Sequence, residues 1–266
     1  MSRAKSILIT GASSGIGAAL ALHYAEKGIS LALAARRPER LEAIASVCRQ
    51  KGANCLTQVL DVRDTGALVD WIETVHAENP IDLAIINAGV AATRVDATSG
   101  ELLTEMRAQI ATNMSGTLMA AQTIGALMFA RRSGHLVLVS SLNAVFPVVE
   151  APTYSATKAG ILAYSDAIRD WLEPRGVHVT AVCPGFVRTG IAERYSGPRP
   201  FEISAEKAAR RIAAGVDGRR RTISFPLVLV AAIHLGRFVP RFCRRRILAA
   251  YTARLAPLAT SDTEGL

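Results

Sequence analysis

The sequence predicts an α/β fold in which a doubly wound parallel sheet of about seven strands is flanked by helices. Short apolar runs alternate with longer stretches of helical period over the first 190 residues. These runs are apolar throughout, which is typical of strands covered on both faces. A glycine-rich turn follows the first run, and folds of this kind bind ligands at the carboxyl ends of their strands.

The elements follow one another in a regular order, and we expect right-handed crossovers between the strands. The strands are expected at residues 6–10, 30–35, 55–60, 82–87, 135–140 and 177–182. The helices between them are expected at residues 15–27, 38–51, 64–78, 99–130 and 153–173. The sequence has no internal repeat and no low-complexity linker, so we expect residues 1–266 to form one domain.

The net charge of +9 is concentrated in the C-terminal part of the chain. Residues 1–187 contain 16 basic and 16 acidic side chains, whereas residues 188–254 contain 15 basic and 4 acidic ones. This asymmetry indicates a partner for the later segment. Its arginines flank an apolar block and do not alternate with aromatic side chains, so a nucleic acid is not the expected partner.

Neither export nor metal binding is expected. The apolar run within residues 1–10 is too short for a signal peptide. The four cysteines show no CxxC pairing and no metal-ligand spacing, and we expect reduced thiols in a cytoplasmic protein. They are Cys48, Cys55, Cys183 and Cys243.

A dinucleotide site is predicted at "TGASSGIG", residues 10–17. Its glycines allow a sharp turn and let a pyrophosphate approach backbone N–H groups at the start of a helix, as in Rossmann-like sheets. The loop residues are Gly11, Ser13, Ser14, Gly15, Ile16 and Gly17. By position alone, the residues after the third and fourth strands flank the adenine: Asp61, Val62, Asn87, Ala88 and Gly89.

Arg36 and Arg37 follow the second strand, where an acidic residue would bind the 2′-hydroxyl of NAD(H). Paired guanidinium groups suit a 2′-phosphate, because they supply charge and bidentate hydrogen bonds. The alternative is a pair of solvated arginines at a helix start, where the helix dipole disfavours cations. The sequence therefore predicts NADP(H) in preference to NAD(H).

Tyr154 and Lys158 lie four residues apart in "TYSATKAG" and project from one face of a helix. A neighbouring ammonium group lowers the pKa of a phenol, so Lys158 is expected to make Tyr154 a usable acid and base. Ser141 ends the fifth strand and can donate to a carbonyl oxygen at the same place. Together these residues predict a catalytic group.

With these motifs in place, the sequence resembles the short-chain dehydrogenase/reductase family from Lys5 to about Ile191. The glycine motif matches residues 10–17 and the Asn-Ala-Gly motif matches residues 87–89. The catalytic set of the family falls on Asn113, Ser141, Tyr154 and Lys158, and its Pro-Gly motif is "PGFVRT" with Pro184, Gly185, Val187 and Thr189. Ser14 departs from the basic residue that some NADP(H)-dependent members carry before the second glycine, so the cofactor prediction rests on Arg36 and Arg37.

The resemblance implies a role for each residue of the site. Tyr154 exchanges a proton with the substrate oxygen, which Ser141 orients and polarises. Lys158 holds the nicotinamide ribose, and Asn113 anchors a water that links Lys158 to solvent. Val187 and Thr189 hold the nicotinamide carboxamide. Residues 1–190 are then the cofactor and catalytic core, and residues 191–266 supply a substrate loop, the last strand and C-terminal helices.

The leading hypothesis is an NADP(H)-dependent enzyme that interconverts a carbonyl and an alcohol. The alternative is a non-catalytic NADP(H)-binding or scaffold protein docked at a membrane surface or a partner, which the complete catalytic set disfavours. The substrate loops at 142–152 and 186–201 are rich in apolar side chains, so an apolar substrate is expected. The expected pocket residues are Asn143, Val145, Val149, Phe186 and Tyr195.

The segment "SFPLVLVAAIHLGRF", residues 224–238, is apolar and lies between two arginine clusters. It is too short to span a membrane, which takes about 20 apolar residues. The resemblance implies a last strand near 221–225, and Pro226 is then expected to start a helix. Three interpretations stay open: a homodimer or homotetramer interface, docking of residues 219–246 on an anionic membrane at the cytoplasmic face, and a substrate lid.

Overall fold

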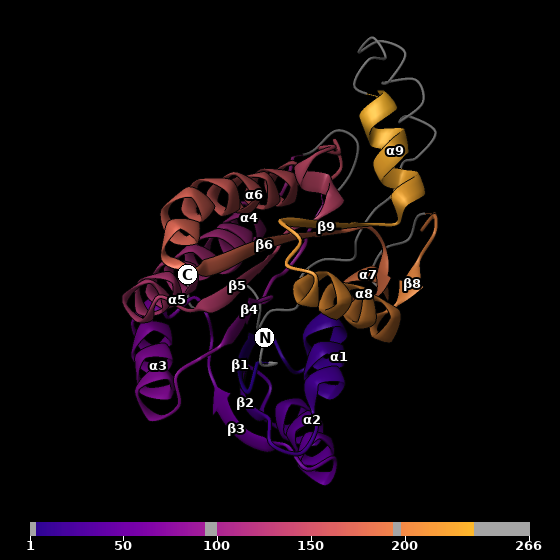
Figure 1. Cartoon of the computed structure of the whole chain (residues 1–266). Helices are drawn as coiled ribbons and strands as arrows, with labels where there is room; N and C mark the ends of the chain where they lie inside the picture. The colour runs from indigo at the N-terminus through magenta and orange to yellow at the C-terminus, as the bar shows by residue number, and fades with distance from the viewer. Residues whose placement is uncertain (1–3, 94–99, 194–197, 237–266) are drawn as a thin grey trace.

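The computed structural model describes residues 4–93, 100–193 and 198–236 (Figure 1). Its centre is a seven-stranded sheet with the order β3-β2-β1-β4-β5-β6-β9, in which every neighbouring pair is parallel. This confirms the predicted doubly wound sheet. The strands are β1 (Ser6–Thr10), β2 (Ser30–Ala35), β3 (Asn54–Val59), β4 (Leu83–Ile86), β5 (Gly134–Val139), β6 (Val177–Pro184) and β9 (Thr222–Phe225).

Helices cover both faces of the sheet because successive strand residues point to opposite sides. Ile7 and Ile9 of β1 belong to a core under α1 (Gly15–Tyr24), α2 (Pro38–Gln50) and α8 (Ala205–Asp217). Leu8 belongs to the opposite core. That core is covered by α3 (Thr65–Glu78), α5 (Thr117–Arg131) and α6 (Pro152–Leu172).

The single helix predicted over 99–130 is wrong in its details. The described part is α4 (Leu103–Gln109), then the π-helix η1 (Ile110–Gly116), then α5. The wider π-helical turn inserts an extra residue, and such turns are frequent at functional sites. Here it contains Asn113, and it ends at Gly116, where a Cβ would lie 2.6 Å from the Val62 carbonyl oxygen. Hydrophobic periodicity could not reveal this contact between residues far apart in the sequence.

Short elements complete the carboxyl edge of the sheet. The 3₁₀ turn η2 (Leu142–Ala144) follows β5, and η3 (Glu173–Arg175) ends α6. The two-residue strands β7 (Val187–Arg188) and β8 (Ile203–Ser204) pair in parallel, and α7 (Gly190–Glu193) follows β7. The predicted last strand is present as β9, beside β6.

The C-terminal helix α9 (Leu227–Gly236) begins one residue after Pro226. The Pro226 carbonyl accepts a hydrogen bond from the Val230 N–H at 3.2 Å, so Pro226 lies at the position that precedes the first helical residue. Within the described residues, no helix is long and apolar enough to cross a membrane.

Candidate active site

The glycine turn between β1 and α1 has the conformation that its sequence predicts. Gly11 and Gly15 have φ values of +68° and +57°, a region that favours glycine. At Gly17, a Cβ would lie 2.3 Å from the Gly11 carbonyl oxygen, so a side chain does not fit. The glycines therefore allow the tight turn that precedes the N-terminus of α1, where a pyrophosphate group binds in folds of this kind.

Asn87, at the end of β4, fixes this turn to the sheet. Its side-chain Nδ2 donates to the carbonyl oxygens of Thr10 and Gly11 at 3.1 and 3.3 Å. The backbone N–H groups of Asn87 and Ala88 donate to the Thr10 hydroxyl at 3.0 and 3.2 Å. Asn87 thus supports the cofactor loop, whereas the sequence placed it only by position.

Of the two arginines after β2, Arg37 reaches the glycine turn and Arg36 reaches Asp61 after β3. Arg37 Nη2 donates to the hydroxyl oxygens of Ser13 at 3.2 Å and Ser14 at 2.8 Å. Arg36 Nη1 lies 3.7 Å from a carboxylate oxygen of Asp61. Two guanidinium groups and two hydroxyls beside a phosphate-binding turn fit a 2′-phosphate. The donor set of this site is therefore compatible with NADP(H).

Asp61 joins this group of charges. Burial raises the pKa of its carboxyl, but hydrogen bonds from Arg63 and the charge of Arg36 lower it more, so the net pKa is below the ordinary value. Arg63 contacts the carboxylate at 2.7 Å. Asp61 therefore remains ionised at neutral pH and holds the Arg36 and Arg63 side chains beside the site.

The catalytic residues meet at the start of α6. Ser141 lies close enough to Tyr154 to influence its pKa, and the Ser141 hydroxyl accepts a hydrogen bond from the Asn143 N–H at 3.1 Å. Burial raises the pKa of Tyr154, and the Ser141 hydroxyl lowers it, with a net increase. We expected Lys158 to be the group that lowers this pKa, but here Ser141 does so.

Lys158 is buried against the end of β5. Its Nζ donates to the Val139 carbonyl at 3.0 Å and lies 5.7 Å from the centre of the Tyr154 ring. Burial lowers the pKa of Lys158 to about 8, partly opposed by the nearby Cys183. An amine with this pKa can exchange a proton near neutral pH.

Asn113 is fully buried and forms the far side of this group. Its amide exchanges two hydrogen bonds of 2.8 Å with the backbone of Val90, and its Nδ2 donates to the Thr157 hydroxyl at 3.3 Å. A Cβ at Gly89 would lie 3.2 Å from Asn113 Oδ1 and 3.4 Å from Lys158 Nζ. Asn113 and Lys158 therefore face the same small space, although the water between them stays a prediction.

The predicted substrate and nicotinamide residues lie along the carboxyl edge. Asn143 and Val145 are partly buried beside Ser141, Val149 is 59% exposed, and Phe186 is partly buried after Pro184 and Gly185. Tyr195 lies outside the described residues. Val187 is buried, and Thr189 approaches the glycine turn, because a Cβ at Gly15 would lie 2.9 Å from its methyl group.

Glu101 is a site residue that the sequence did not reveal. Its Oε2 accepts hydrogen bonds from the Thr153 N–H at 3.0 Å and from the Thr153 hydroxyl at 2.5 Å. The local N-cap, Ala151, has no side chain that could serve this purpose. A carboxylate 52 residues away therefore caps the helix that carries Tyr154.

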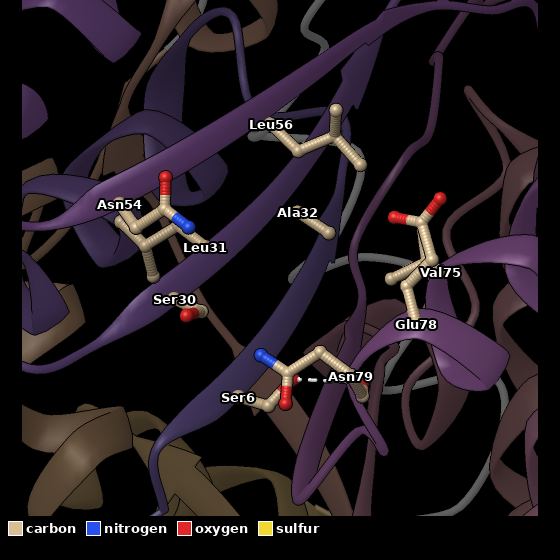
Figure 2. A pocket seen from close by; sticks show the side chains of 9 residues that line it. All are labelled: Ser6, Ser30, Leu31, Ala32, Asn54, Leu56, Val75, Glu78 and Asn79. Atoms are coloured by element: carbon tan, nitrogen blue, oxygen red, sulfur yellow. Dashed lines mark hydrogen bonds between the residues drawn. The ribbon is translucent and has the colours of Figure 1, made fainter.

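A surface hollow lies elsewhere in the molecule (Figure 2). Ser6, Ser30 and Asn54 contribute to it, and they are the first residues of β1, β2 and β3. The Ser6 hydroxyl donates to the Asn79 carbonyl at 3.2 Å, as the dashed line shows. Since ligands of this fold bind at the opposite ends of the strands, the hollow is not part of the candidate site.

A glycine turn, a pair of arginines and a Ser-Tyr-Lys group at one sheet edge define a dinucleotide-dependent oxidoreductase. A family model described as short chain dehydrogenase matches residues 5–199. An uncharacterized oxidoreductase of Myxococcus xanthus is 31% identical over 239 residues, which cover 89% of this chain and 93% of the relative. An 11-beta-hydroxysteroid dehydrogenase-like protein of Arabidopsis thaliana is 34% identical, with coverages of 80% and 70%.

A solved short-chain dehydrogenase from Sphingobium yanoikuyae, in complex with NADPH, aligns with a TM-score of 0.74. It is 26% identical and the alignment covers 96% of this chain and 99% of that one. The present chain belongs to the short-chain dehydrogenase/reductase family and is an oxidoreductase that acts on carbonyl and alcohol groups.

Proposed function

We propose that the protein is an NADP(H)-dependent oxidoreductase that interconverts a carbonyl and an alcohol on an apolar, lipid-like substrate. The observation that carries the proposal is the grouping of Ser141, Tyr154 and Lys158, with Lys158 Nζ 5.7 Å from the centre of the Tyr154 ring, at the sheet edge that also holds the glycine turn. Bound NADPH would supply the hydride for reduction, and NADP⁺ would accept it in the reverse direction.

Each residue of the site has a defined task in this proposal. Ser141 donates to the substrate oxygen and orients it, and Tyr154 gives that oxygen its proton during reduction or removes it during oxidation. Lys158, with its pKa near 8, returns the proton to Tyr154 and would hold the ribose hydroxyls of the cofactor. Asn113 fixes the Val90 backbone and would hold the water that connects Lys158 to solvent.

Arg36 and Arg37 would select the 2′-phosphate, because the Arg37 guanidinium group contacts the glycine turn and Arg36, which precedes it, contacts Asp61 after β3. We expect the dissociation constant of NADP to be at least tenfold lower than that of NAD. This ratio corresponds to a difference in binding free energy of about 1.4 kcal/mol. The variant Arg36→Ala/Arg37→Ala should abolish this preference, whereas Arg210→Ala, on the exposed face of α8, should retain it. Equal affinities in the wild type would contradict the cofactor assignment.

An apolar substrate is supported by the side chains of Val145, Val149 and Phe186 beside the catalytic group, and by a relative named as hydroxysteroid dehydrogenase-like. The test is a panel of ketones matched in reactivity but graded in apolar size, assayed by oxidation of NADPH. We expect kcat/KM to rise with apolar size. A preference for sugars or polyols would refute the substrate class, and no turnover of any carbonyl would favour the scaffold alternative.

The proposed assembly is a homodimer or homotetramer. Trp171, on α6, is 39% exposed and stacks on Phe129 of α5, and Met119 of α5 is 42% exposed. Exposed apolar side chains on two adjacent helices are suited to a self-complementary interface. Light scattering should report a mass of two or four chains, and Met119→Glu/Trp171→Glu should reduce it to one.

A further inference from the structure

The helix α9 is apolar on every side and is not packed into the core. Apart from His234 and Gly236, its residues are Leu, Val, Ala and Ile. Leu227, Val228 and Leu235 are 75%, 59% and 71% exposed, and no residue of α9 whose side chain is described is buried. Figure 1 shows the helix projecting away from the sheet and its covering helices. A contiguous exposed apolar surface of this kind marks an interaction site.

The place where α9 leaves the domain is next to the candidate active site. A Cβ at Gly185 would lie 3.0 Å from Pro226 Cδ and 3.3 Å from Leu142 Cδ1. Leu142 directly follows Ser141, and the Gly185 N–H donates to the Phe225 carbonyl at 2.7 Å. A surface that binds α9 therefore lies on the side of the molecule that receives the substrate.

The charges around α9 identify the kind of surface. The sequence that follows it, residues 237–246, has five arginines and no acidic residue. The earlier arginines at 219–221 precede β9, at the opposite end of that strand from α9, and Arg221 pairs with Glu173 at 2.7 Å. They do not belong to the same surface, so the described part of the segment expected to dock narrows from 219–236 to 227–236, and residues 237–246 of that prediction lie outside the described residues.

The apolar surface of α9 and the basic sequence after it distinguish between two possible partners, a second copy of the chain and a lipid surface. A second copy of the chain offers no carboxylate in its own residues 237–246 to pair with these arginines, so self-association through this part of the chain leaves their charge unmatched. An anionic lipid surface accepts both features, because apolar side chains enter the boundary of the acyl chains while arginines meet the head groups. With ten residues, about 15 Å of helix, α9 reaches only about half of the hydrocarbon thickness.

We infer that α9 docks the enzyme on an anionic membrane surface, with the active site facing the lipid, and the basic sequence after α9 supplies the charge that favours such a surface. The docking itself is independent of the catalytic proposal. The delivery of an apolar substrate from the lipid to Tyr154 rests on the function proposed above.

The experiment is sedimentation of the full-length chain with vesicles of phosphatidylcholine, with and without phosphatidylserine, at low and high salt. We expect binding to the anionic vesicles that weakens with salt. Leu227→Gln/Leu235→Gln should weaken it at least tenfold, and Arg244→Gln/Arg245→Gln/Arg246→Gln by about fivefold for each charge. Both leucines are exposed, so the variant should fold. The matched control is Leu56→Gln/Val59→Gln, on the far edge strand β3, which should bind as the wild type does.

Three results would overturn the inference. The first is no binding to anionic vesicles at low salt, and the second is equal binding to neutral vesicles. The third is that Leu227→Gln/Leu235→Gln leaves the affinity for vesicles unchanged, which would mean that α9 packs against its own chain. The same holds if this variant loses oligomer mass and not vesicle binding, which would mean that α9 binds a second copy. Turnover of a water-soluble ketone with NADPH should be unaltered in the α9 variant. If the wild type does not turn over such a ketone, this result would count against the catalytic proposal and not against the docking.

Discussion

Replacing Lys158 by methionine is expected to stabilise the protein at neutral pH. Burial lowers the pKa of Lys158 from the ordinary 10.5 to about 8. Each unit of pKa corresponds to 1.36 kcal/mol, so the charged form costs the folded state about 3 kcal/mol. Methionine removes this cost but leaves the Val139 carbonyl without its donor, a loss of about 1–2 kcal/mol. The net gain in unfolding free energy is about 1–2 kcal/mol.

The pH dependence of this effect has a definite sign. Because the folded pKa lies below the unfolded one, the cost of the charge is complete below pH 8 and disappears as the pH rises towards 10.5. The variant should therefore be more stable than the wild type at pH 7 and slightly less stable near pH 10, where less than about 1 kcal/mol of the cost of the charge remains and the lost hydrogen bond outweighs it.

Urea unfolding of the cofactor-free protein at both pH values measures these differences. Lys207→Met, at an exposed position of α8, is the matched control and should show no crossover between them. A Lys158→Met variant that is less stable than the wild type at pH 7 would refute the reasoning, because the ammonium would then be well accommodated by its surroundings.

Three further changes test the fold around the site. Burial, His178 and Arg219 lower the pKa of His135 to about 4, so stability should fall as the pH drops from 6.5 to 4, and His135→Gln should remove up to about 3 kcal/mol of this dependence in urea titrations. Glu101→Ala should cost about 1–2 kcal/mol and lower kcat, whereas Glu101→Gln keeps an acceptor and should retain most of both; equal losses would contradict the cap. Gly17→Ala should raise the Kd of NADPH at least tenfold in fluorescence titrations, and an unchanged Kd would contradict the tight turn.

Much of the fold could be predicted because its signals are local. Most strands of the sheet are short apolar runs and the helices between them have a clear period, so six strands were placed within a few residues, and the family resemblance placed the seventh, β9. The π-helix was not predicted. It depends on the approach of Val62 to Gly116 and on the hydrogen bonds of Asn113 with Val90, which join residues far apart in the sequence.

The candidate site divides in the same way. Gly11, Tyr154 and Lys158 lie in motifs with fixed spacing, so their positions follow from the sequence. The cap that Glu101 provides is a contact across 52 residues with no motif of its own. The absence of a capping side chain at Ala151 indicated only that another group had to cap the helix. The pKa shifts also depend on burial, which is why the group that lowers the Tyr154 pKa was not foreseen.

The most direct test of the central claim is the turnover of Tyr154→Phe with the best carbonyl substrate and NADPH. The ring remains and only the hydroxyl that exchanges the proton is lost, so we expect kcat to fall by at least about 100-fold while the Kd of NADPH changes less than about twofold. A variant that retains more than about a hundredth of the wild-type rate, with NADPH still bound, would contradict the assignment of Tyr154 as the acid and base.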